Sequence, residues 1–140
     1  MTTSSAPTQS GPSTDETAVA ADIMRRIVTA WAEHDADAFA AAFTEDASMI
    51  LPGLYRKGRD QIRDFMATAF AGPYQGTRVT GEPLDLKFLG EDVAVLLTVG
   101  GVLAPGEQEL SDKQAVRAIW LLVRRDGQWL LTTYLNTPRG

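Results

Sequence analysis

Residues 113–137 read KQAVRAIWLLVRRDGQWLLTTYLNT, two apolar stretches separated by a charged turn. Apolar and polar side chains alternate, and β-branched and aromatic residues are frequent, a pattern that predicts strands over Lys113–Arg125 and Gln128–Thr137. Asp126-Gly127 between them is typical of a tight turn. We therefore expect an antiparallel hairpin at this end of the chain.

The period of two continues toward the N-terminus. It predicts strands over Thr77–Leu89 and Val93–Leu103, with turn residues at 90–92 and 104–107. A short apolar run before them, Ala47–Leu51, predicts one further strand.

Before residue 77 the apolar period is three to four, which predicts three amphipathic helices. The first covers Asp15–Glu33, the second runs from a cap at Asp35 or Asp37 to near Thr44, and the third covers 58–70. The apolar positions are Val19, Ile23, Ile27, Ala30 and Trp31, then Phe39 and Phe43, then Ile62, Phe65, Met66, Ala69 and Phe70.

Helices followed by strands indicate an α+β domain, in which three N-terminal helices pack on one face of a curved antiparallel sheet. We assign residues 15–140 to this single domain, which fits a chain of 140 residues. Residues 1–14, rich in Ser, Thr and Pro, are expected to form a disordered tail. Ser13 and Glu16 fit a capping box at the start of the first helix.

The strand around Trp120 is apolar on both faces. Its two sets of side chains are Val116, Ala118, Trp120 and Leu122 on one face and Ile119, Leu121 and Val123 on the other. Helices cover one face only, so the second predicts a homodimer through the sheet. The alternative is an ordinary scatter of exposed apolar residues.

Composition excludes several function classes. There is no Cys and only one His, which removes thiol chemistry and self-contained multi-histidine metal centres. The net charge of −5 argues against nucleic acid as a partner, and the longest apolar run, Ala118–Val123, is too short to span a membrane.

No basic residue precedes Arg25, so a secretory signal is not expected and we place the protein in the cytoplasm. Nucleotide-binding motifs are missing, and we expect neither a cofactor nor a metal.

Five short segments together resemble one known superfamily. They are WAEHDADAF from Trp31, FTEDA from Phe43, GRDQI from Gly58, RRDGQW from Arg124 and YLNTP from Tyr134. In order and spacing they resemble the NTF2-like superfamily, the fold of ketosteroid isomerases and SnoaL-type cyclases. The closing segments are similar to the SgcJ/EcaC-type branch, found in enediyne and other polyketide biosynthesis. The resemblance implies a cone-shaped domain, commonly dimeric, with a deep pocket for an apolar small molecule.

The same resemblance argues against steroid-isomerase chemistry. A base, a tyrosine and an aspartate perform that reaction in the isomerases of this fold, which are a worked case of pKa tuning. The corresponding positions here fall near Leu51, Ile27 and Ile119 or Trp120, which are all apolar.

Few polar residues remain as catalytic candidates. Asp46, beside Glu45, is the first candidate carboxylate, with a cap or salt bridge at the turn as the alternative. Tyr134 and Asn136, which share a face of the last strand with Leu130 and Thr132, are expected to orient a substrate or polarise a carbonyl. Their alternative is a buried Tyr-Asn hydrogen bond near the pocket mouth.

Other candidates have simpler explanations. His34 is a possible base, although its place at the end of a helix already explains it. The expected ligand-binding residues are Trp31, Tyr55, Phe65, Trp120, Tyr134 and Asn136, whereas Trp129 is assigned to packing. The basic residues Arg56, Lys57, Arg59 and Arg63 indicate a solvated face.

The sequence thus predicts a pocket protein that binds an apolar polyketide-type intermediate. It leaves open whether the protein also cyclises or otherwise processes this intermediate, which would proceed by proton transfer without a cofactor. The alternative is a non-catalytic accessory or carrier protein of such a pathway. A pocket carboxylate with a raised pKa would favour the enzyme, and a wholly neutral pocket would favour the carrier. A purely structural interaction domain, the third hypothesis, would fill the pocket with its own side chains.

Overall fold

The computed structural model describes residues 14–139, with side chains from Thr17 onward. The first helix begins at Thr14, and the remainder of the predicted tail, residues 1–13, lies outside the described residues. The predicted capping box also falls outside them, because the side chains of both Ser13 and Glu16 are not described.

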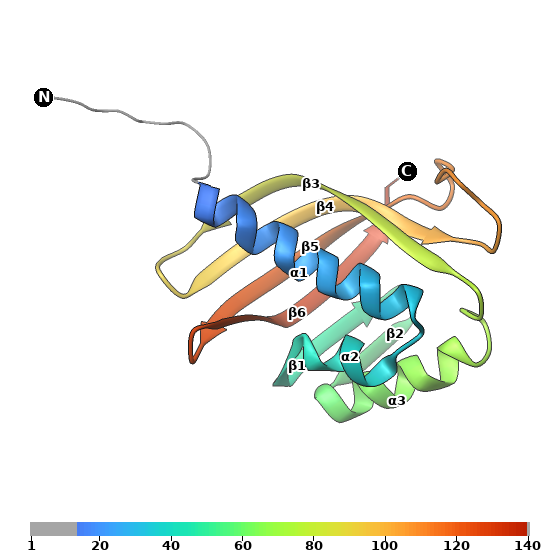
Figure 1. The fold of residues 1–140 in the computed structure, drawn as a ribbon, viewed down its shortest axis with the longest axis horizontal. Helices are drawn as coiled ribbons and strands as arrows, with labels where there is room; N and C mark the ends of the chain where they lie inside the picture. The colour runs from blue at the N-terminus through green and yellow to red at the C-terminus, as the bar shows by residue number, and fades with distance from the viewer. Residues whose placement is uncertain (1–13, 140) are drawn as a thin grey trace, which may run out of the picture.

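Within residues 14–139, three helices and six strands confirm the α+β class. In chain order they are α1 (Thr14–Ala32), α2 (Ala36–Ala41), β1 (Phe43–Leu51), β2 (Leu54–Lys57), α3 (Arg59–Phe70), β3 (Arg78–Phe88), β4 (Val93–Leu103), β5 (Val116–Arg125) and β6 (Gln128–Pro138). The six strands form one sheet in the order β2-β1-β6-β5-β4-β3. Helix α1 lies across one face of this sheet, and α2 and α3 lie beside β1 (Figure 1).

The prediction of a wholly antiparallel sheet is wrong at one junction. The last strand, β6, pairs antiparallel with β5 as expected, but its other edge pairs parallel with β1. These two strands are far apart in sequence and no turn joins them, so no local signal announces the pairing. Strand β2, which was not predicted, pairs with β1 and completes this end of the sheet.

Two element boundaries also differ from the prediction. Helix α2 ends at Ala41, and Phe43 already belongs to β1, where its carbonyl accepts hydrogen bonds from Arg59 Nε at 3.0 Å and Nη2 at 2.6 Å. Spacing alone could not reveal this contact. Strand β5 begins at Val116, because Ser111 and Gln114 form a turn in which the Gln114 amide donates to the Ser111 carbonyl at 3.1 Å.

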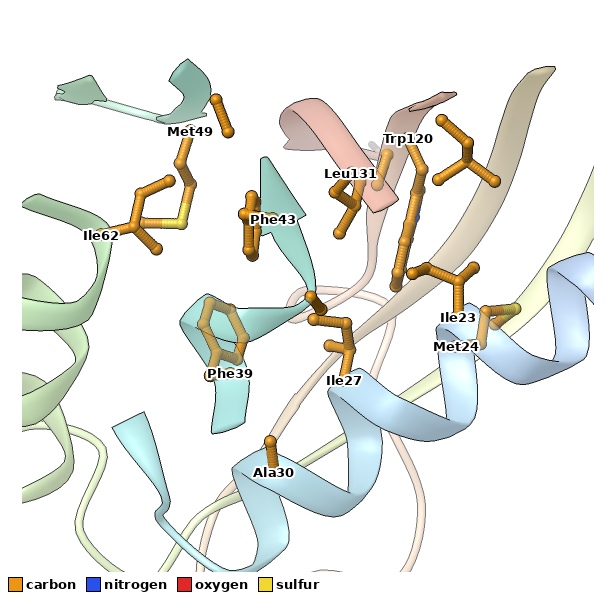
Figure 2. Packing of buried hydrophobic residues seen from close by; sticks show 14 of the residues in the cluster. Ile23, Met24, Ile27, Ala30, Phe39, Phe43, Met49, Ile62, Trp120 and Leu131 are labelled. Atoms are coloured by element: carbon orange, nitrogen blue, oxygen red, sulfur yellow. The ribbon is translucent and has the colours of Figure 1, made fainter. Parts of the chain in front are cut away.

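The core lies between α1 and the covered face of the sheet. Ile23, Ile27 and Ala30 of α1 are buried at the predicted spacing, and Met24 is buried beside them. Trp120 points from β5 toward them, and Phe39 and Phe43 lie beside this group (Figure 2). Apolar burial on this face holds the helix to the sheet.

Glycines allow the backbones of β3 and β4 to lie close together. Gly81 pairs directly with Gly100, and Thr80 pairs with Gly101. A Cβ atom on Gly100 would lie 2.1 Å from the carbonyl oxygen of Thr80, which is far inside van der Waals contact. Only glycine therefore fits at this position of β4.

The two-faced apolar pattern of β5 is confirmed. Ala118, Trp120 and Leu122 are buried, whereas Ile119 on the opposite face is 39% exposed.

Within residues 14–139, no helix has the length and apolar character required to cross a membrane.

Candidate functional site

A cavity of about 420 Å³ lies between α1 and the inner face of the sheet. Its apolar lining includes Met24, Ile27, Trp31, Phe43, Met49, Met66, Ala118, Trp120 and Leu131. Three other lining residues, Pro73, Thr80 and Ala104, are exposed to solvent and therefore mark the opening. A void of this size is typical of small-molecule sites, and it removes the hypothesis of a pocket filled by the protein's own side chains.

The two indole N–H groups in the cavity wall are both bound by threonines. Trp31 Nε1 donates to Thr77 Oγ1 at 2.9 Å, and the Thr77 hydroxyl donates in turn to the Tyr74 carbonyl at 2.6 Å. Trp120 Nε1 donates to Thr98 Oγ1 at 3.0 Å. These bonds satisfy the buried donors, so the tryptophans contribute mainly apolar ring surface to the cavity.

Tyr134 and Asn136 form a polar pair in the otherwise apolar wall. Asn136 Nδ2 donates to Tyr134 Oη at 3.1 Å, and the Tyr134 ring packs edge-on against Trp120 with 5.5 Å between ring centroids. Burial raises the pKa of Tyr134, although the hydrogen bond from Asn136 opposes this effect. The phenol therefore stays protonated near neutral pH and can donate a hydrogen bond.

The cavity is uncharged. No Asp, Glu, His, Lys or Arg lines it in the described part of the chain. Its titratable groups are the phenols of Tyr74 and Tyr134, and burial raises the pKa of both. General acid-base chemistry normally uses groups with pKa values near the working pH, which these phenols do not provide.

A family model of the SnoaL-like domain matches residues 24–131, most of the chain and nearly all of the cavity wall. The chain belongs to the SnoaL-like domain family. No curated protein matches it.

Solved structures agree with the SnoaL-like assignment. A domain of unknown function with a cystatin-like fold from Nostoc punctiforme is 29% identical, with a TM-score of 0.82 over 92% of this chain and 80% of that one. An NTF2-like protein from Novosphingobium aromaticivorans is 18% identical, with a TM-score of 0.76 over 89% of this chain and 82% of that one. A ketosteroid isomerase-like protein from Erwinia carotovora atroseptica is also 18% identical, with a TM-score of 0.70 over 91% and 98%. These structures confirm the NTF2-like fold.

The SnoaL-like domain brings four of the predicted ligand-binding residues together. Trp31, Trp120, Tyr134 and Asn136 all line the cavity. The face of β6 that carries Tyr134 and Asn136 differs from the prediction, however. The pairing register between β5 and β6 shifts between Leu121 and Leu122. The shift leaves one extra residue in β6, so Leu131 rather than Leu130 or Thr132 lines the cavity with Tyr134 and Asn136.

Asp46 is not in the cavity, which corrects its prediction as a catalytic carboxylate. The pairing of β1 with β6 is irregular between Phe43 and Ser48, and both Glu45 and Asp46 face solvent there. The Asp46 carboxylate accepts a hydrogen bond from the Thr44 hydroxyl at 2.8 Å, which lowers its pKa, and it lies 3.8 Å from Arg125. Asp46 therefore pairs with Arg125 from within β1, on the solvent side of the strand.

Tyr55 and Phe65 are also outside the cavity. Tyr55 lies in β2, is 57% exposed and pairs with Ile50 on the uncovered face of the sheet. Phe65 of α3 is half-buried beneath the Arg56 guanidinium, 5.2 Å from its ring centroid. Neither residue lines the cavity, and for Tyr55 the reason is its place in β2, a strand that was not predicted.

His34 lies just beyond the end of α1 and is half-buried. It follows α1 with a positive φ of 52°, and its Nε2 lies 3.2 Å from the Thr77 carbonyl, outside the cavity. Among the described residues, no three His, Asp or Glu side chains are grouped to hold a metal ion.

Thr98 and Gln114 are among the polar cavity residues that the sequence did not predict. Thr98 is the one polar residue within the apolar segment VAVLLTVGG. A single hydroxyl in an apolar strand indicates a buried hydrogen bond, and Thr98 accepts one from the Trp120 indole. Gln114 reaches the opening from the loop before β5, where its Nε2 donates to Glu107 Oε1 at 2.9 Å. No local sequence pattern indicates that Gln114 lies at the opening of the cavity.

Proposed function

We propose that this SnoaL-like domain binds a neutral, largely apolar small molecule in its cavity and carries it rather than transforming it. The observation that supports this function most directly is the uncharged lining of the 420 Å³ void. Apolar walls with a few convergent polar groups are typical of small-molecule sites. Because no ionised side chain is present, a charged ligand would lose its hydration without gaining a partner.

Catalysis by proton transfer is the less favoured alternative. The positions that correspond to the catalytic groups of the isomerases fall near Leu51, Ile27 and Ile119 or Trp120. Of these residues, Leu51, Ile27 and Trp120 line the cavity, and none of them carries an acid or a base. Tyr134 would have to act alone, and its raised pKa suits hydrogen-bond donation better than proton abstraction. The resemblance to the SgcJ/EcaC-type branch suggests an apolar polyketide-type intermediate as the natural ligand.

Native mass spectrometry of the protein purified from its producing cells tests this function. We expect one apolar small molecule bound per chain, and binding of the neutral dye Nile red after that molecule is removed. Replacing Ala118 by Phe should block both, because this buried residue lines the cavity. Arg117→Phe, on the exposed neighbouring position, is the matched control. Binding that survives in a folded Ala118→Phe variant, or turnover of the bound molecule, would contradict the carrier function.

We also propose that the domain forms a homodimer through the uncovered face of its sheet. Directly paired residues form one apolar row across five strands of this face, namely Leu97, Ile119, Leu135, Ile50 and Tyr55. Ile50 and Tyr55 are 40% and 57% exposed, which is unusual for a continuous apolar row on a monomer. A second copy of the same face would cover it by two-fold symmetry.

A further inference from the structure

The Tyr134-Asn136 pair has hydrogen-bonding capacity that the protein does not use. Asn136 Oδ1 is buried and has no partner, and it is the one such side-chain nitrogen or oxygen among the described residues. Tyr134 Oη accepts from Asn136 Nδ2, so its own hydrogen remains available. A buried acceptor without a partner normally destabilises a protein, which makes a ligand group the natural occupant.

Three other polar groups of the inner wall already have partners within the protein. The indole of Trp31 is bound to Thr77, and the indole of Trp120 is bound to Thr98. The Thr77 hydroxyl is itself occupied by the Tyr74 carbonyl. Among the described residues, Asn136 Oδ1 is the buried side-chain acceptor without a partner, and the available hydrogen of Tyr134 lies next to it.

We infer that this pair recognises a hydroxyl group on an otherwise apolar ligand. The hydroxyl hydrogen would bind Asn136 Oδ1, and the hydroxyl oxygen would accept the Tyr134 hydrogen. A ketone or an ether can use only the second of these bonds, and a hydrocarbon can use neither. A carboxylate offers no hydrogen at neutral pH and would enter an uncharged cavity. This inference rests on the proposed binding function and specifies the chemical class of the ligand.

The apolar part of such a ligand would contact flexible methionine side chains in the cavity wall. Met24, Met49 and Met66 line the cavity, and unbranched thioether side chains adjust to different shapes. Trp120 packs edge-on against Tyr134, so it lies beside the bound hydroxyl and provides apolar contact for the atoms that carry it. Ligand specificity would thus come mainly from hydrogen bonds to Tyr134 and Asn136 rather than from the shape of the cavity.

A matched ligand series tests the inference by calorimetric titration of the full chain at pH 7. The probes are 2-naphthol, 2-methoxynaphthalene, 2-acetylnaphthalene and naphthalene, which share one aromatic body. We expect 2-naphthol to bind about tenfold more tightly than the ether or the ketone, the effect of one buried hydrogen bond. In Asn136→Leu this preference should fall to about one, while naphthalene binding is retained. Tyr134→Phe provides a second variant that removes the donor instead.

The outcomes separate the inference from the function on which it rests. Equal binding of all four probes would overturn the hydroxyl specificity and leave the apolar carrier function in place. Tighter binding of the ketone would overturn it too, because the amide NH₂ of Asn136 would then face the ligand. Failure of every probe to bind would refute the proposed function, and the inference with it.

Discussion

Replacing Asn136 by Asp tests whether the cavity is uncharged and dry. The two side chains have nearly the same shape, but the carboxylate would replace a buried amide oxygen that has no partner. Burial raises a carboxyl pKa by up to 3–5 units, and a hydrogen bond from the Tyr134 hydroxyl would offset part of this. We therefore expect a folded-state pKa about two units above the unfolded value of about 3.9. Two units correspond to about 2.7 kcal/mol of lost stability when the group is ionised.

The pH dependence of this loss has a definite sign. Below about pH 4 the new carboxyl is protonated in both states, so the variant should approach the stability of the parent. Between about pH 4 and 6 the unfolded state loses its proton first, and the free energy of unfolding falls. Above about pH 6 the loss is constant, which for 140 residues lowers the unfolding midpoint by roughly 9 °C.

Urea and thermal unfolding between pH 4 and 8 measure this difference. Thr137→Asp is the matched control, because it adds the same charge to the neighbouring exposed position of β6. Asn136→Leu removes the amide without adding a charge, so its stability difference should not vary with pH. If Asn136→Asp stayed within about 0.5 kcal/mol of the parent at pH 7, the dry, neutral cavity would be refuted, and the proposed function would lose its main support.

Three further predictions follow from other contacts. Ile119→Asp places a charge in the middle of the apolar row and should convert a dimer into a monomer in sedimentation experiments; a dimer that persists would contradict the sheet-face interface. Thr98→Val should leave the Trp120 indole N–H unpaired and lower the unfolding midpoint by roughly 3–10 °C in calorimetry, whereas an unchanged midpoint would show that this bond is dispensable. Asp46→Asn should leave ligand affinity unchanged within about twofold, since the exposed carboxylate is outside the cavity, and a large loss would return Asp46 to the site.

The amino-acid sequence by itself determined the class of the fold and the type of most of its elements. Helix α1 and strands β4 and β6 follow from periodicities of three to four and of two, which are local properties of consecutive side chains. The turn at Asp126-Gly127 is equally local. Tyr134 and Asn136 were predicted to face the pocket because the family resemblance places that face of the last strand toward it. Trp31 and Trp120 were predicted as ligand contacts because their rings offer flat apolar surface.

Tertiary structure decided the arrangements that depend on distant partners. The parallel pairing of β1 with β6 and the hydrogen bonds from Arg59 to the Phe43 carbonyl join residues with no local signal between them. The register shift in β6 placed Leu131 on the cavity side, and the irregular start of β1 turned Asp46 toward solvent. Whether the cavity contained an ionised group was therefore settled by non-local pairing, because moving a strand by one residue exchanges its two faces.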